Sequence, residues 1–180
     1  MNVRPADAEK PAAEWRRWLW RTIGRPLFPL TPHNAYAMRR FLLRLGGAKL
    51  ARTAKFRRTV RLDRPWNVRA DDLAMLGDGV VVCAVAPIRI GKRCVISQYT
   101  KLLTCVRDHR AVGFPLHAAP ITIEADCWIA TDTLVMPGAS LRRGSVVGAR
   151  GMVQGEIPPW TVAVGEPAVP RHRRELAAPE

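Results

Sequence analysis

An aspartate and a histidine stand side by side in the segment TCVRDHR, which runs from Thr104 to Arg110. Histidine has an ordinary pKa near neutral pH, so its imidazole can accept the proton of a weakly acidic hydroxyl. A neighbouring carboxylate such as Asp108 can orient that imidazole. Asp108 and His109 are therefore the first candidates for a general base, although the same pair could be two solvated side chains in a turn.

His117 is a second, weaker candidate among the four histidines of the chain. A structural histidine that faces solvent is the commoner role at such a position. Arg107 directly precedes Asp108, and its guanidinium cannot act as a base at any ordinary pH. Its charge could instead contact a phosphate or an acceptor molecule.

The composition bounds the partners that these residues could serve. The 180 residues suit one domain, and 29 basic against 15 acidic residues give a formal net charge of +14. That charge favours phosphorylated cofactors, acidic lipid head groups or nucleic acid. No helix-turn-helix, RNA-recognition or zinc-finger pattern is present, so nucleic acid is not expected as the main partner. The polar start is no signal peptide and no apolar run suits a membrane span, so we expect a cytoplasmic protein with reduced cysteines.

Two short helices are expected before the main body, after a disordered tail at residues 1–12. Trp15, Trp18 and Leu19 are spaced three and four apart, so they share one helix face, and arginines flank it. A cluster of three prolines ends this helix, and Gly46 followed by Gly47 ends the next. Residues 13–47 then form either a helical cap packed on the body or a basic, tryptophan-bearing surface that touches the inner face of an anionic membrane.

From Leu50 onward, large apolar residues recur every six positions, a period that neither a helix nor an alternating strand produces. These positions are Leu50, Phe56, Leu62, Ala70, Leu76, Val82, Ile90, Ile96, Leu102, Ile123, Ile129, Val135, Leu141, Val147 and Val153. A second and usually small residue follows each one four positions later, and this second set includes Trp66, Ala86 and Val106. The period indicates a β-solenoid in which each hexad supplies one short strand and one turn.

Three hexads close one triangular coil, so the fold class is predicted as all-β, a left-handed parallel β-helix over residues 48–165. Five coils begin at residues 50, 70, 90, 123 and 141. The first two steps are two residues longer than three hexads, which predicts a small outward excursion in each. The step from 90 to 123 leaves an extra loop at about residues 108–122, and residues 166–180 remain as a basic C-terminal tail.

Several segments together resemble a known family. They are FLLRLGGAKL, RPWNVRADD, APIRIGKRCVISQ, FPLHAAPITIEADCWIA and IPPWTVAVGEPAVP. From about Trp15 to Arg174 the chain resembles the hexapeptide-repeat acyltransferases, and within them the colanic acid biosynthesis acetyltransferase branch. The resemblance implies a homotrimer with acetyl-CoA in the groove between neighbouring prisms. It also implies a histidine base that lets an acceptor hydroxyl attack the thioester directly, without an acyl-enzyme or a metal.

The resemblance also assigns site residues one by one. Relatives carry Ser-His-Asp-Tyr where this chain has Val106 to His109, so their histidine falls on Arg107 and their aspartate on Asp108. His109 then lies two residues late, about 6–7 Å along an extended chain, and the loop must bring it back. Arg107 and His117 are the expected acceptor-binding residues. The expected acetyl-CoA contacts are Trp128, Ala130, Thr131, Gly148, Ala149 and Arg171.

Two functions follow as hypotheses. The first is an acetyl-CoA-dependent O-acetyltransferase that modifies a sugar hydroxyl during the synthesis of a surface polysaccharide. The second is a non-catalytic relative that serves as a trimeric scaffold or binding protein. This alternative is motivated by Arg107 in the base position and by Ala84 and Gln154, where relatives carry other residues.

Overall fold

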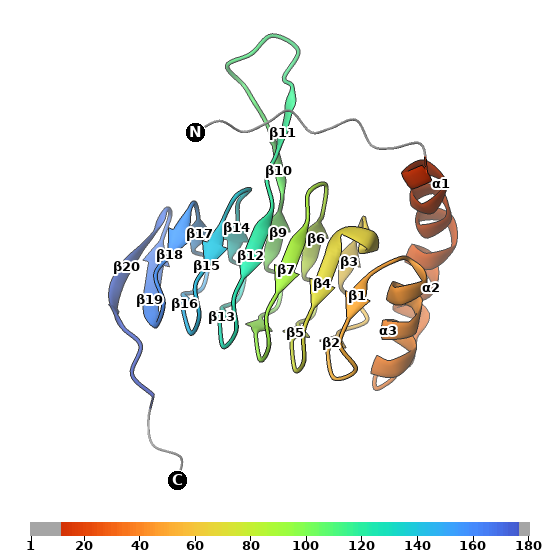
Figure 1. The fold of residues 1–180 in the computed structure, drawn as a ribbon, viewed down its shortest axis with the longest axis horizontal. Helices are drawn as coiled ribbons and strands as arrows, with labels where there is room; N and C mark the ends of the chain where they lie inside the picture. Colours follow the sequence, from red (N-terminus) through yellow and green to blue (C-terminus); the bar gives the residue numbers. More distant parts are fainter. Residues whose placement is uncertain (1–11, 177–180) are drawn as a thin grey trace.

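The body of the protein is a triangular prism of stacked coils, closed at one end by helices (Figure 1). The computed structural model describes residues 12–176, so the tail expected at 1–12 lies almost wholly outside the described residues. No helix within 12–176 is long and apolar enough to cross a membrane. The predicted fold class, a left-handed β-helix with a short helical cap, is confirmed.

Three parallel sheets form the faces of the prism, and each coil adds one strand to each sheet in turn. Sheet 1 holds β1 (Lys49–Leu50), β4 (Val68–Ala70), β7 (Ile88–Ile90), β12 (Ile121–Ile123), β15 (Ser140–Leu141) and β18 (Glu156–Ile157). Sheet 2 holds β2 (Lys55–Phe56), β5 (Met75–Leu76), β8 (Val95–Ile96), β13 (Trp128–Ile129), β16 (Val146–Val147), β19 (Thr161–Gly165) and the antiparallel β20 (Ala168–Arg173). Sheet 3 holds β3 (Arg61–Leu62), β6 (Val81–Cys83), β9 (Lys101–Leu103), β14 (Leu134–Val135) and β17 (Met152–Val153).

The hexad positions fill the interior as predicted. All fifteen large positions are buried, and equivalent residues stack in register, so that Leu50 lies beside Ala70 and Ile123 beside Leu141. This stacking explains the period, because every coil places its residues over the same interior column. The strands β18 and β19 begin a sixth, incomplete coil beyond the five that were predicted.

The corner between sheet 3 and sheet 1 departs from the prediction. Trp66 and Ala86 are only partly buried, because the two extra residues of the first two steps leave the prism at this corner. Val106 is exposed because it lies in the long extra loop, which leaves at the same corner. Ile88 and Ile121, which lie on sheet 1, fill the interior beside it.

The helical cap closes the first coil. It comprises α1 (Ala12–Leu19), a π-helical turn (Trp20–Gly24), α2 (Arg25–Leu27), a 3-10 turn (Phe28–Leu30) and α3 (Tyr36–Leu45). The first helical segment ends within the predicted proline cluster, since α2 ends at Leu27 and the 3-10 turn ends at Leu30. Pro26 takes a first-turn position of α2, where proline is tolerated.

The cap supplies hydrogen-bond donors that the first coil lacks. The first coil bonds the second coil on one side, as Lys55 N does to Ala74 O, but no coil lies on its other side, so the carbonyls that point to that side lack a partner in the sheet. Side chains of the cap bond these carbonyls. Arg39 donates to Phe56 O at 2.7 Å, Arg40 to Ala54 O at 3.0 Å, Arg44 to Leu50 O at 2.7 Å and Trp20 Nε1 to Leu62 O at 2.8 Å. The cap is thus built as an end plate.

The segment expected as a basic tail begins as a strand. β20 folds back on β19 as an antiparallel partner in sheet 2. Arg174 then donates to the carbonyls of Asp126 and Gly144 at 2.7 and 2.9 Å. Residues 177–180 lie outside the described part of the chain.

Candidate active site at the hairpin of the third coil

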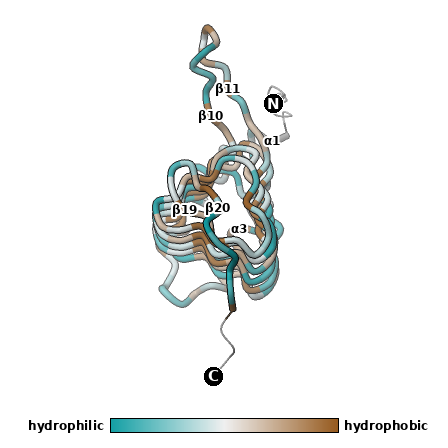
Figure 2. Tube along the Cα trace, turned by 90° about the vertical axis from the view of Figure 1, so that its left-hand side faces the viewer, coloured by the Kyte–Doolittle hydropathy of each residue, from teal (hydrophilic) through white to brown (hydrophobic). Residues whose placement is uncertain are grey.

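The extra loop is a β-hairpin that leaves the prism between sheet 3 and sheet 1 (Figures 1 and 2). Its strands are β10 (Cys105–Arg107) and β11 (Leu116–Ala118), which pair antiparallel with Val106 opposite His117. It starts three residues before the predicted loop. Gly113 lies near its tip with a φ of +81°, a conformation that glycine adopts without strain.

The register of this hairpin brings Asp108 to His117. Val106 lies opposite His117, and Asp108 is two residues further along the same strand direction, so both side chains project from one face of the hairpin. Nε2 of His117 lies 3.5 Å from Oδ2 of Asp108. The backbone N–H of Asp108 donates to Pro115 O at 3.0 Å, which extends the pairing by one step and fixes the carboxylate.

The surroundings favour the ionised form of Asp108. The backbone N–H of Arg110 donates to its Oδ1 at 2.9 Å, and this bond is the main reason why the pKa of Asp108 lies below its ordinary value. Electrostatic interactions of Asp108 with His117, His109 and Arg110 act in the same direction. Asp108 is therefore a carboxylate, able to accept an N–H from an imidazole.

The two ring nitrogens of His117 have different surroundings, since Nε2 faces Asp108 and Nδ1 does not. Both His117 and Asp108 are about one-third exposed. In the described part of the chain, Nδ1 of His117 is buried and has no hydrogen-bond partner. Unpaired buried polar atoms are uncommon and mark places where a ligand or a strained group is held.

The structure places the carboxylate of Asp108 against His117, and the predicted pair of Asp108 with His109 stays a prediction. Asp108 turns its carboxylate toward Arg110 N and His117, while His109 is exposed beyond the end of β10. Adjacent residues of a strand point to opposite faces, so the neighbour in sequence is not the neighbour in space.

Arg107 lies on the other face of the hairpin. It is opposite Leu116, and its Nη1 donates to Phe114 O at 3.0 Å, so the guanidinium holds the hairpin turn. The basic head is exposed and stays open to an anionic ligand.

The residues expected to contact acetyl-CoA lie at a different corner. Ala130 and Thr131 form the turn from sheet 2 to sheet 3 in the fourth coil, and Gly148 and Ala149 form the same turn in the fifth. Trp128, on the adjoining strand, is 48% exposed and donates its Nε1 to Ser97 Oγ at 3.0 Å. We call these five residues the turn strip.

A shallow hollow of about 440 Å³ adjoins the turn strip, within the range of small-ligand sites. Its lining includes Thr131 and two cations that the sequence analysis missed, Lys101 and Arg150. Both surround Asp132, with Lys101 Nζ at 3.1 Å and Arg150 Nε at 3.8 Å from its carboxylate oxygens. Lys101 directly precedes the hexad position Leu102, and Arg150 follows the hexad position Val147 by three residues. Counting from the hexads could therefore have placed both cations beside the turn strip.

The turn strip and the Asp108–His117 pair cannot meet within one chain. Sheet 3 separates their corners along its whole width. Arg171, the remaining expected cofactor contact, is exposed on β20 at a register shift opposite Val162 and Ala163. A site that used both features would need two copies of the chain.

Comparisons with known proteins fit this architecture. The chain is 40% identical over 151 residues to a protein of Escherichia coli K12 assigned as colanic acid biosynthesis acetyltransferase WcaF, covering 84% of this chain and 83% of the relative. The hexapeptide-repeat acetyltransferase VCA0836 of Vibrio cholerae superposes with a TM-score of 0.82 at 23% identity, over 92% of this chain and 94% of that one. A maltose O-acetyltransferase of Clostridium difficile 630 gives 0.77 at 22% identity, over 93% and 90%. No protein-family model matches the chain.

Proposed function

Because the chain belongs to the hexapeptide-repeat acetyltransferases of the colanic acid biosynthesis type, we propose that it moves an acetyl group from acetyl-CoA to a sugar hydroxyl during polysaccharide synthesis. The observation that carries the chemistry is the Asp108–His117 pair in the hairpin. The sugar acceptor is supported by the relative assigned to colanic acid synthesis. The maltose O-acetyltransferase supports the fold alone. Four free thiols among the described residues suit a reducing compartment, and we place the reaction in the cytoplasm.

We assign the general base to His117 in place of His109. Asp108 accepts the N–H at Nε2 and so leaves the lone pair of Nδ1 for the acceptor hydroxyl, which reaches it when the imidazole tilts outward. As the proton moves to Nδ1, the hydroxyl oxygen forms a bond to the thioester carbonyl carbon and the carbon–sulfur bond breaks. The departing sulfur takes the proton back from the imidazolium, which leaves an O-acetyl sugar and CoA thiol.

The donor lies, in this proposal, along the turn strip. Trp128 offers a flat apolar surface for the pantetheine arm, and the small residues Ala130, Gly148 and Ala149 keep the backbone accessible to it. Lys101 and Arg150 line the hollow beside the strip and Arg171 is exposed on β20, and we assign these three cations to the CoA phosphates. Since strip and hairpin occupy different corners, we propose a homotrimer in which one protomer supplies each half of a site.

The test measures CoA release from acetyl-CoA with a thiol reagent, over a panel of sugar acceptors. His117→Gln should lower kcat by about 10²- to 10⁴-fold, the usual contribution of a general base. The matched change His109→Gln should stay within about threefold of the parent, because the histidine paired with Asp108 in the structure is His117. The opposite ranking would assign the base to His109.

A non-catalytic scaffold is the second candidate, and Arg107 is the observation that favours it. Where relatives carry the catalytic histidine, this guanidinium is tied to Phe114 O. Titration calorimetry with acetyl-CoA separates the two functions, since a protein that binds no acetyl-CoA cannot be the proposed enzyme. A variant Arg107→His that gained activity from an inactive parent would support the scaffold.

A further inference from the structure

The helical cap carries an apolar surface that the prism does not cover. Six side chains form it: Trp15, Leu19, Ile23 and Leu27 from the first helical segment, and Phe41 and Leu45 from α3. Each is between 41% and 68% exposed. We call this surface the cap face. An exposed set of this size is unusual for a protein surface and marks a contact site.

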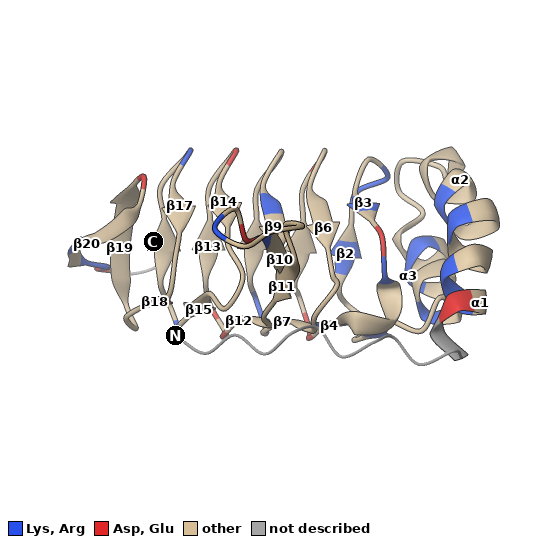
Figure 3. Cartoon of the chain, turned by 90° about the horizontal axis from the view of Figure 1, so that it is seen from above, with Lys and Arg blue, Asp and Glu red and all other residues tan. Residues whose placement is uncertain are grey.

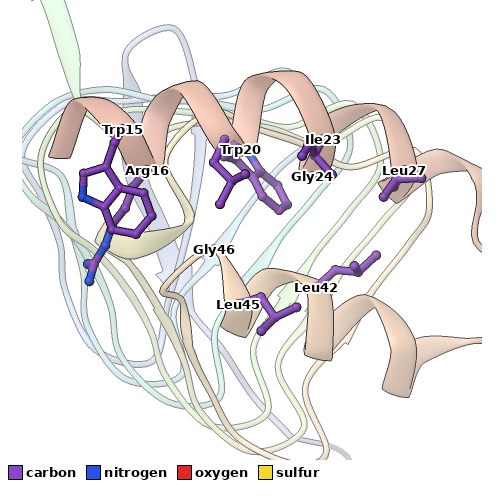
Figure 4. Close-up of a pocket in the computed structure, with 10 residues that line it drawn as sticks. Trp15, Arg16, Trp20, Ile23, Gly24, Leu27, Leu42, Leu45 and Gly46 are labelled. Carbon is purple, nitrogen blue, oxygen red and sulfur yellow. The ribbon is translucent and has the colours of Figure 1, made fainter. Parts of the chain in front are cut away.

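A groove runs between the two helices of the cap face (Figure 4). Trp15, Ile23 and Leu27 line one side, and Leu42 and Leu45 line the other. Its volume is about 150 Å³, well below the roughly 300 Å³ at which small-molecule sites begin. The groove therefore suits the insertion of a few apolar groups from a broad surface rather than the enclosure of a whole ligand.

Positive charge surrounds the cap face. Residues 12–47 contain seven arginines and no lysine, against the single acidic residue Glu14, as the blue bands on α1, α2 and α3 show (Figure 3). Three of the seven bond carbonyls of the first coil or the cap itself. Arg16, Arg21 and Arg25 on the first helical segment are exposed, and Arg16 lies 5.4 Å from the ring centre of Trp15.

The spacing arranges these groups as an interfacial helix requires. Trp15, Leu19, Ile23 and Leu27 recur every four residues and form one stripe. Arg21 and Arg25 recur on a second stripe, with the exposed Trp18 beside them. Long arginine side chains can reach sideways to head groups while their stems stay near the apolar surface. Tryptophan is enriched at the boundary between lipid and water.

We propose that the cap face docks on the surface of an anionic membrane, with its apolar stripe among the acyl chains and its arginines at the lipid phosphates. A second copy of the chain fits less well, because cap-to-cap contact would bring two sets of seven arginines together in a protein of charge +14. An anionic bilayer offers negative head groups for the arginines and an apolar interior for the exposed side chains of the cap face.

The experiment is co-sedimentation of the full chain with vesicles of neutral phosphatidylcholine, with or without 30% phosphatidylglycerol. Binding should appear only with the anionic lipid and weaken as salt rises. Arg21→Gln with Arg25→Gln should reduce the partition coefficient about 25-fold, at about fivefold for each charge near the surface. Leu19→Ser with Ile23→Ser should also abolish binding.

The matched control is Arg69→Gln with Arg89→Gln, which removes the same charge from exposed neighbours on β4 and β7. It should change binding less than threefold. If both arginine double variants lost vesicle binding equally, binding would depend on the overall positive charge and the proposal would be overturned. A parent chain that fails to sediment with anionic vesicles would also overturn it.

A fall in oligomeric mass of the cap variants by light scattering would show that a second copy covers the cap face, and would also overturn the proposal. The arginine pair keeps the test decisive if the serine pair fails to fold. CoA release with a soluble sugar acceptor is measured on the same samples, so failure to dock and failure of the proposed activity are distinguished.

Discussion

At the scale of single residues, the carboxylate of Asp108 is the best-defined group of the candidate site. It receives the N–H of Arg110 and faces the imidazole of His117. Both contacts favour its charge, so the lowered pKa keeps Asp108 ionised wherever the enzyme would work. The role that we propose for Asp108 is orientation of His117 through its N–H, with no proton transfer by the carboxyl group itself.

Asp108→Asn should remove the carboxylate charge and keep the shape of the side chain. The amide oxygen can still accept the N–H of Arg110, so the hairpin should persist, while kcat should fall about tenfold to a hundredfold for want of the oriented imidazole. Steady-state rates with acetyl-CoA and sugar acceptor measure the loss. Unchanged kcat would remove Asp108 from the mechanism.

The same variant gives a pH prediction for stability. A carboxyl group whose pKa is lowered by folding stabilises the folded state above its unfolded pKa, near 3.9 for aspartate, and loses that contribution as the pH falls through the lower folded value. The melting temperature of the parent should therefore exceed that of Asp108→Asn at neutral pH. The gap should close only in that acidic window, as scanning fluorimetry can follow.

At the scale of elements, what the sequence predicts well is the part that repeats. Leu76 and Ile96 occupy the same interior column because each coil imposes the same constraint on its successor, so a six-residue period is enough to place them. The hairpin has no such repetition. Its strand pairing depends on turn geometry, and a slip of one residue would turn Asp108 away from His117. For that reason the sequence located the hairpin corner, but it paired Asp108 with His109, whereas the structure places His117 beside Asp108.

Arg39 should be the most sensitive residue of the end plate. It is fully buried and donates to Phe56 O, Pro32 O, His33 O and Thr31 Oγ1. Arg39→Met would remove the side-chain donor from all four acceptors, of which Pro32 O would keep the N–H of Ala35. The change should lower the free energy of unfolding by about 3 kcal/mol. Urea unfolding of parent and variant measures this loss of stability. The exposed Arg58→Met serves as control and should stay within about 0.5 kcal/mol of the parent.

At the scale of the whole molecule, the two halves of the proposed site lie at corners that sheet 3 keeps apart. The hexads place both halves on their corners, since turn positions follow from the count of coils. No pattern within the chain states which corner would face a neighbouring copy, so the shared site stays a proposal.

Mixing two inactive variants tests the shared site. His117→Gln should lose the base and Ala149→Trp should obstruct the turn strip. Co-expressed in equal amounts, a trimer pairs an intact hairpin with an intact strip in about a quarter of its interfaces, since each is drawn with even odds. CoA release should return to about a quarter of the parent rate. A mixture as inactive as its components would place both halves of the site in one protomer.

The two ends of the prism carry one more consequence. Stacked coils do not limit their own number, because the backbone groups at each exposed rim can pair with another strand. That strand can come from a different molecule. Trp20 and the three arginines stop growth at one rim by taking up its carbonyls. β20 folds back over part of the other. The cap and β20 therefore prevent strand addition at the two ends of the prism. Removing either one should expose a rim at which molecules can add end to end and form fibres.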